Sequence, residues 1–133
     1  MCQKNLWYSN DVRSESPVTD QYYHIYNRGN NRQNIFRGEA DKEKLLLLFL
    51  LFQSDVSPDV VTQSLLHNSE KHRLIANSDS FNKKRYAKLI NFILMPNHFH
   101  LTVCQIKNGG ISKYLQRVQN AYTKYYNSKY DLS

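Results

Sequence analysis

The amino-acid sequence predicts an α+β fold, in which an antiparallel sheet has helices packed on one of its faces. Segments with strand and helix patterns follow one another in the order strand, helix, strand, strand, helix. A polar and irregular insert, residues 54–83, separates the first helix from the second strand. With 133 residues, the chain is long enough for one domain with one core. A ferredoxin-like sheet fits this order, with room for one further strand near residues 71–76.

The first half of the domain is predicted to contain one strand and one helix. Residues 1–19 are rich in Ser and Asp and are expected to form a flexible leader, so the domain itself spans residues 20–133. In Gln21–Gly29, Tyr, His and Ile favour an extended strand. A helix is predicted from Glu39 to Ser54, with acidic residues at its start and an apolar second half. Such a helix should be buried on most sides or lie partly at a dimer interface.

The second half of the domain is predicted to contain two strands and a helix. Before them, an N-cap serine, a first-turn proline and an early acid predict a short helix over residues 57–66 of the insert. The strands are predicted at Ala87–Leu94 and His98–Cys104, with Met95-Pro96-Asn97 between them. A glycine pair then opens a last helix, predicted over Ile111–Lys129.

The composition indicates an anionic partner and a reducing compartment. The formal net charge of +7 is typical of proteins that bind nucleic acid, although surplus surface lysine is the alternative. Cys2 and Cys104 are the two cysteines and form no disulfide framework, which favours a cytoplasmic location. No membrane partner is expected, because the most apolar stretch, Leu45–Phe52, is too short to span a bilayer.

The stretch Leu94–Val103, LMPNHFHLTV, places two histidines one residue apart. Because side chains alternate along a strand, His98 and His100 would share one face, while Phe99, Leu101 and Val103 would be buried on the other. The Cα atoms of the two histidines would lie about 6.5–7 Å apart, close enough for both imidazoles to reach one ion. Two imidazoles leave positions for a third group, water and substrate, as a catalytic metal requires. The alternative is two polar residues on the solvent face of an ordinary sheet.

Three stretches resemble, in order, the single-tyrosine transposases of the HUH superfamily, and among them the insertion-sequence and REP-associated tyrosine transposases. The stretches read YHIYNRGNNRQNIF, LMPNHFHLTV and GGISKYLQRVQNAYTKYYN. The resemblance implies a ferredoxin-like or RRM-like sheet, and it implies that His98 and His100 bind Mg²⁺ or Mn²⁺. It also implies that a tyrosine attacks single-stranded or hairpin DNA, which leaves a 5′-phosphotyrosine link and a free 3′-OH. A homodimer is a further expectation from the resemblance.

The sequence departs from this family at the nucleophile. The family's tyrosine is implied on a later helix in a Tyr-x-x-x-Asn or Tyr-x-x-x-Gln pattern, whose amide supplies a third metal ligand. Residues 105–133 contain no such pair. We therefore expect a C-terminally truncated chain that lacks the family's tyrosine helix. Tyr122 is the catalytic candidate within the last helix, although at 100° per residue it falls on the apolar stripe and is predicted to pack.

Two groups of residues are candidates for DNA contacts. The first lies after the first strand, in the N-R-G-N stretch that carries part of the resemblance, and consists of Arg28, Asn30 and Arg32. The second lies on the last helix, opposite its apolar stripe, and consists of Lys113, Arg117 and Lys124. Both groups would hold phosphates without reading sequence, and a solvated basic face is the alternative for the second.

Three functions remain open at this stage. The first is metal-assisted nicking and rejoining of single-stranded DNA by a transposase. The second is a truncated or domesticated nucleic-acid-binding module without catalysis. The third is a metal-dependent hydrolase of small molecules, which is disfavoured because no Asp or Glu occurs between residues 82 and 130. The other histidines, His24, His67 and His72, are predicted to be surface or packing residues.

Overall fold

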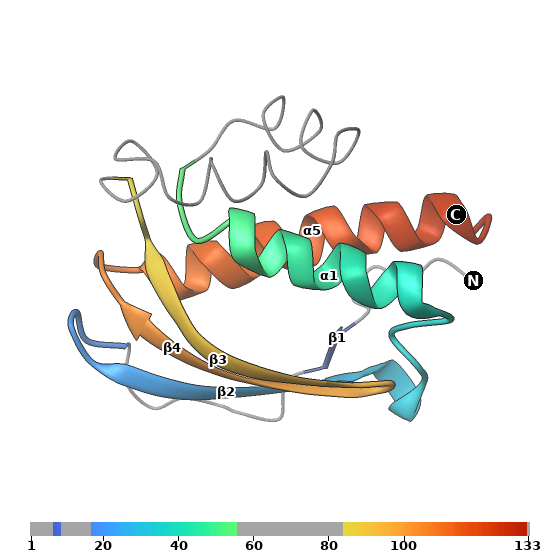
Figure 1. Cartoon of the computed structure of the whole chain (residues 1–133), viewed down its shortest axis with the longest axis horizontal. Coiled ribbons are helices and arrows are strands. Elements are labelled where there is room, and N and C mark those ends of the chain that lie inside the picture. The colour runs from blue at the N-terminus through green and yellow to red at the C-terminus, as the bar shows by residue number, and fades with distance from the viewer. Residues whose placement is uncertain (1–6, 9–16, 56–83, 133) are drawn as a thin grey trace.

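The computed structural model describes residues 7–8, 17–55 and 84–132 (Figure 1). In chain order the elements are β1 (Trp7–Tyr8), β2 (Tyr22–Gly29), a short 3₁₀ turn (Asn30–Arg32), α1 (Glu39–Leu51), β3 (Ala87–Met95), β4 (His98–Gln105) and α5 (Gly110–Lys129). The three longer strands and α5 begin and end within one residue of the predicted bounds. The helix and the strand predicted within the insert lie outside the described residues.

The sheet is antiparallel and has the strand order β1-β2-β4-β3. The chain leaves β2, passes through α1 and returns as β3, with β4 inserted between the two strands, which is the split βαβ pattern of ferredoxin-like folds. Both helices lie on the same side of the sheet (Figure 1). The predicted α+β fold is therefore confirmed. β1 pairs with the end of β2, so two residues of the predicted leader belong to the sheet, and the boundary at residue 20 stays a prediction.

The core lies between the sheet and the two helices. On β4, alternate apolar residues point into it, and Phe99, Leu101 and Val103 are at most 1% exposed, as the alternation predicted. The Phe99 ring packs edge-on against Phe49 of α1, with 5.2 Å between the ring centroids. Burial of apolar side chains from the sheet and both helices is the main stabilising contribution to this layer.

The first helix is shorter than predicted and ends at Leu51 rather than Ser54. The residues after it turn toward the sheet instead. Ser54 forms a bridge with Arg85, and the carbonyl of Gln53 accepts a hydrogen bond from the Tyr86 amide (2.7 Å). These backbone pairings replace the next helical turn. The apolar half of α1 is mostly buried, although Leu50 is 40% exposed.

Two tyrosines of the last helix, α5, donate hydrogen bonds from the core to backbone carbonyls of other segments. The Tyr114 hydroxyl is buried and donates to the carbonyl oxygen of Phe49 in α1 (2.5 Å). The Tyr122 hydroxyl is likewise buried and donates to the carbonyl oxygen of Ile35. The start of α5 lies close to the backbone of Tyr86. A Cβ at Gly110 would collide with the Tyr86 carbonyl, so only glycine, which has no Cβ, fits there.

A buried carboxylate, Asp41, joins the start of α1 to the end of α5. Its side chain is fully buried and accepts hydrogen bonds from the Arg37 amide (2.9 Å), the Tyr125 hydroxyl (2.9 Å), the Tyr130 hydroxyl and the Lys129 ammonium (2.8 Å). Burial by itself would raise the pKa of this carboxyl. The donors outweigh burial and lower the pKa to about 2. The charged form is therefore the one that the fold stabilises.

Replacement of this carboxylate tests its role. Asp41→Asn should lower the free energy of unfolding at neutral pH by on the order of 2–3 kcal/mol, because the folded state binds the anion more favourably than the unfolded chain does. Since the folded pKa is depressed, the contribution is present above about pH 4 and is lost as the pH falls toward 2. Urea unfolding at several pH values measures both effects.

The matched control is Glu39→Gln, an exposed acid in the first turn of the same helix. It should leave both the stability and its acid dependence nearly unchanged. Equal losses in the two variants would contradict the role given to Asp41.

Candidate metal and nucleic-acid site

The sheet face that points away from the helices carries the candidate site. We call it the open face, because no helix covers it among the residues that the structure describes. Register places its residues in four rows across β2, β4 and β3. The rows are Tyr22–Cys104–Lys88, His24–Thr102–Asn91, Tyr26–His100–Ile93 and Arg28–His98–Met95. Several members are well exposed, with Tyr22 at 67% and Ile93 at 60%.

His98 is held by the residue before it. Its Nδ1 lies 2.7 Å from the Asn97 side-chain oxygen, which can only accept, so Nδ1 donates. The Asn97 amide nitrogen in turn donates to the Arg32 carbonyl (3.5 Å), which fixes which end of the amide faces the histidine. Neutral His98 therefore carries its proton on Nδ1 and keeps a lone pair on Nε2. Nε2 can then bind a metal ion while Nδ1 is held by its hydrogen bond.

His100 is held by a histidine on the neighbouring strand. His100 Nδ1 lies 2.9 Å from Nε2 of His24, and the two rings meet edge-on with their centroids 5.1 Å apart. The prediction had assigned His24 to the surface or to packing. Its side chain is exposed, but it contacts a candidate ligand directly. The residue could have been found from the sequence only if the pairing register of β2 with β4 had been known.

The two predicted ligands lie side by side, with 5.4 Å between the ring centroids of His98 and His100. Partial burial lowers the pKa of His100, and the nearby His24 and His98 lower it further. The imidazole is thus favoured in the neutral form that binds metals. Among the described residues, no group of three or more His, Cys, Asp or Glu side chains could hold a metal ion. In donor type the histidine pair itself fits a divalent ion.

An aromatic ring and a guanidinium group complete the surroundings of the pair. The Tyr26 ring contacts both histidines, with centroid distances of 4.7 Å to His100 and 5.7 Å to His98. Arg28, directly opposite His98, places its guanidinium 5.5 Å from the Tyr26 ring centroid. Its Nε is buried and has no hydrogen-bond partner within the described part of the chain.

The remaining predicted DNA contacts do not all reach this face. Arg32 is exposed in the turn that follows β2, as part of the segment that supports Asn97, and of Asn30 the structure describes the backbone alone. Lys113 and Lys124 are exposed on α5, which covers the opposite face of the sheet. The predicted residues thus fall into two groups on opposite layers of the molecule.

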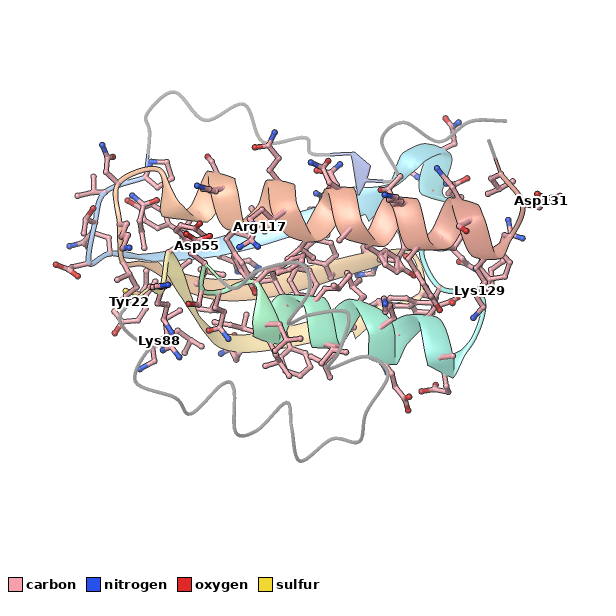
Figure 2. All side chains as sticks on the ribbon, turned by 90° about the horizontal axis from the view of Figure 1, so that it is seen from above. Tyr22, Asp55, Lys88, Arg117, Lys129 and Asp131 are labelled. Carbon is pink, nitrogen blue, oxygen red and sulfur yellow. The ribbon has the colours of Figure 1, made fainter. Side chains whose placement is uncertain are left out.

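Arg117, the third predicted contact on α5, points inward. Its guanidinium donates to the Ser54 carbonyl (2.9 Å) and stacks on the Phe52 ring at 4.4 Å. Figure 2 shows this side chain close to Asp55, whose pKa is lowered mainly by the Tyr86 side chain and further by the Arg117 charge. Arg117 therefore contacts the residues that follow α1, and its predicted contact with DNA stays a prediction.

Tyr122, the predicted nucleophile candidate, also lies on the helix side of the sheet. Burial raises the pKa of its phenol, and the nearby Asp41 and neighbouring tyrosines raise it further. Its hydroxyl is fully buried against Ile35. A phosphate on the open face would be separated from it by the sheet. This placement argues against a catalytic role and supports the predicted packing role.

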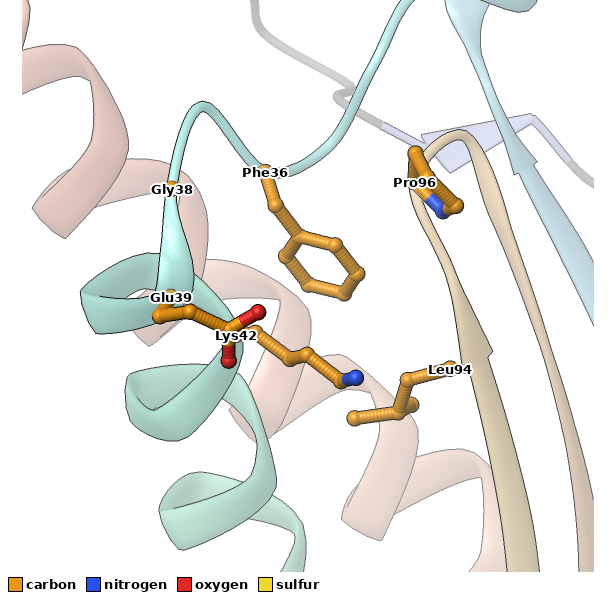
Figure 3. A pocket seen from close by; sticks show the side chains of 6 residues that line it. All are labelled: Phe36, Gly38, Glu39, Lys42, Leu94 and Pro96. Carbon is orange, nitrogen blue, oxygen red and sulfur yellow. The ribbon is translucent and has the colours of Figure 1, made fainter.

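A shallow pocket of about 340 Å³ lies beside the turn between β3 and β4, on the helix side of the sheet (Figure 3). Phe36, Leu94 and Pro96 form its apolar lining, and the side chain of Lys42 crosses it. Leu94 pairs with Phe99, so it belongs to the face opposite the histidines. The pocket is therefore separate from the candidate site.

Comparison with known families decides the assignment of the chain. The model of the family described as "Transposase IS200 like" matches residues 17–133. The chain belongs to the IS200-like transposase family. This match extends over all of β2, α1, β3, β4 and α5, and it includes both histidines of the candidate site. No curated protein and no solved structure matches the chain.

Membership places the chain among the transposases of mobile elements, whose substrate is DNA. The resemblance drawn from three sequence stretches is thereby confirmed at the level of the family. No helix in the described part of this IS200-like transposase is long and apolar enough to cross a membrane.

The packing role of Tyr122 can be tested by removing one oxygen. Tyr122→Phe should lower the free energy of unfolding by about 1–3 kcal/mol, because the buried Ile35 carbonyl loses its donor. Binding of DNA and of metal should remain at the wild-type level. Denaturant unfolding combined with a DNA-binding titration separates the two effects. A variant of unchanged stability that has lost covalent attachment to DNA would restore Tyr122 as the nucleophile.

Proposed function

We propose that this chain binds single-stranded or hairpin DNA on the open face and takes part in metal-assisted nicking and rejoining of the strand. The observation that supports this most is the histidine pair, in which both Nδ1 atoms are engaged in hydrogen bonds. Two neighbouring imidazoles whose Nε2 atoms are not used in these hydrogen bonds would suit a divalent cation with open positions. Membership of a DNA transposase family supplies the substrate class.

His98 and His100 would hold Mn²⁺ or Mg²⁺, and imidazole ligands suit Mn²⁺ better. When bound, the ion would withdraw charge from a phosphate and so contribute several kcal/mol to lowering the barrier. Water and phosphate oxygens would fill the other coordination positions. Arg28 lies in the row of His98, and its guanidinium would donate to the same phosphate group.

The proposed chemistry conserves the phosphodiester bond energy. A tyrosine oxygen forms a bond to phosphorus and gives up its proton, while the bond from phosphorus to the 3′ oxygen breaks. The products are a 5′-phosphotyrosine link and a 3′-hydroxyl, and rejoining reverses these changes. Tyr114 and Tyr122, whose hydroxyls are buried in the core, are not assigned this role. Tyr26 is the described tyrosine whose ring contacts both histidines.

Adduct formation tests the proposal. The 133-residue chain is mixed with labelled single-stranded hairpin DNA and Mn²⁺, and the products are separated under denaturing conditions. We expect DNA binding and, where a tyrosine of this chain attacks, a denaturant-resistant adduct. Tyr26→Phe is then the first variant to examine. His98→Ala combined with His100→Ala should abolish Mn²⁺ binding and any adduct.

The same double variant distinguishes catalysis from binding alone. If it loses Mn²⁺ but keeps its DNA affinity, and the wild type forms no adduct, the chain acts as a DNA-binding module whose nucleophile comes from elsewhere. Absence of both Mn²⁺ binding and DNA binding in the folded wild-type chain would sink the proposal.

The face that DNA uses can be identified from salt dependence. Arg28→Ala should weaken single-stranded DNA binding and make the slope of log affinity against log salt shallower by about 0.7, because one phosphate contact is lost. Lys124→Ala removes a charge from the outside of α5 and serves as the matched control. Fluorescence titrations at several salt concentrations measure both slopes. If only Lys124→Ala changed the affinity and the slope, the DNA-binding surface would lie on the helix side of the sheet instead.

A further inference from the structure

We propose that His24 is a positioning residue, which keeps His100 protonated on Nδ1 and thereby leaves a lone pair on Nε2. The hydrogen bond on which this depends joins two strands far apart in sequence, with 2.9 Å between His24 Nε2 and His100 Nδ1. The consequence for metal binding rests on the proposed function. The tautomer of His100 does not, because it depends on the direction of this hydrogen bond and can be measured without a metal.

The direction of this hydrogen bond decides what His100 can do. A neutral imidazole has one N–H and one lone pair. If His100 donates through Nδ1, its Nε2 keeps the lone pair. If His24 donates instead, the proton of His100 must sit on Nε2, and its Nδ1 lone pair is occupied. His100 then has no lone pair left for a metal, so only the first direction is compatible with a ligand.

The first direction would give the two motif histidines equivalent ring states. Nδ1 of His98 donates to Asn97, so both motif histidines would carry the same tautomer and present the same atom. The rings of His98 and His100 lie at 84° to each other, with 5.4 Å between their centroids, while Tyr26 packs against both. His24 is thus the counterpart of Asn97, supplied by β2 rather than by the residue before the ligand. Acceptors in this position commonly raise metal affinity 10–100-fold.

Two substitutions of His24 differ in whether they keep a hydrogen-bond acceptor. His24→Ala removes the acceptor, whereas His24→Gln places an amide oxygen near the position of Nε2 and can accept the same hydrogen bond. His24 is exposed, so neither change should unfold the chain. Thr102→Ala is the matched control, because Thr102 is the cross-strand partner of His24 in the same row.

The experiment reads the His100 tautomer directly. Long-range ¹⁵N–¹H correlation spectra are recorded at about pH 8, more than one unit above the usual histidine pKa. In the wild type and in Thr102→Ala, His100 should carry its proton on Nδ1. In His24→Ala a large Nε2-protonated population should appear, and His24→Gln should restore the wild-type pattern. In parallel, titration of Mn²⁺ alone, followed by electron paramagnetic resonance, should show about tenfold weaker binding in His24→Ala.

Each outcome separates the two proposals. Nε2 protonation of His100 in the wild type, or spectra that are unchanged in His24→Ala, would overturn the role of His24. Spectra that depend on His24 in a chain that binds no Mn²⁺ would support the positioning role and overturn the metal-assisted function. Weaker Mn²⁺ binding with an unchanged tautomer would show that His24 acts by another route, which also overturns the inference.

Discussion

β4 is hydrogen-bonded to strands on both of its sides, and its side chains alternate between two environments of opposite character. Phe99, Leu101 and Val103 lie in the core, and their burial fixes which face of β4 turns inward. The register therefore cannot slip by one residue without exposing the whole apolar set. His98 and His100 lie on the open face as a consequence. The candidate site is thus a direct result of the same packing that holds the sheet to its helices.

The helix side of the sheet uses its polar groups for a different purpose. The hydroxyls of Tyr114 and Tyr122 are buried, and each donates to a backbone carbonyl. Asp41, at the start of α1, accepts hydrogen bonds from side chains at the end of α5. Polar groups that are satisfied in this way stabilise the layer but are not available to a ligand. The tyrosines of α5 that enter the core are therefore structural, while the sheet separates them from the histidines.

The sequence predicted the parts of this architecture that depend on local periodicity. Alternation along residues 98–104 gave the face of each histidine, and the turn at Gly109-Gly110 gave the start of the last helix. Residues whose roles depend on register between distant strands could not be found in this way. His24 is 76 residues away from His100 in the chain, so only the pairing of β2 with β4 makes them neighbours. The contacts of Arg117 could not be found for a related reason, because its helical angle does not reveal that Ser54 and Phe52 lie beside it.

The link between the N-R-G-N stretch and the histidine motif has a physical basis in the backbone. The amide of Gly29 donates to the Asn97 carbonyl (2.9 Å), and the amide of Ile35 donates to the Pro96 carbonyl (2.7 Å). The loop after β2 is thereby tied to the turn before β4 at two points. Gly29 has to be glycine, because a Cβ there would collide with the carbonyl of Gln33. This turn also orients the Asn97 side chain, which holds His98. A substitution that shifts the backbone of the loop after β2 would therefore change the position of His98, although no side chain of the loop needs to contact the histidine.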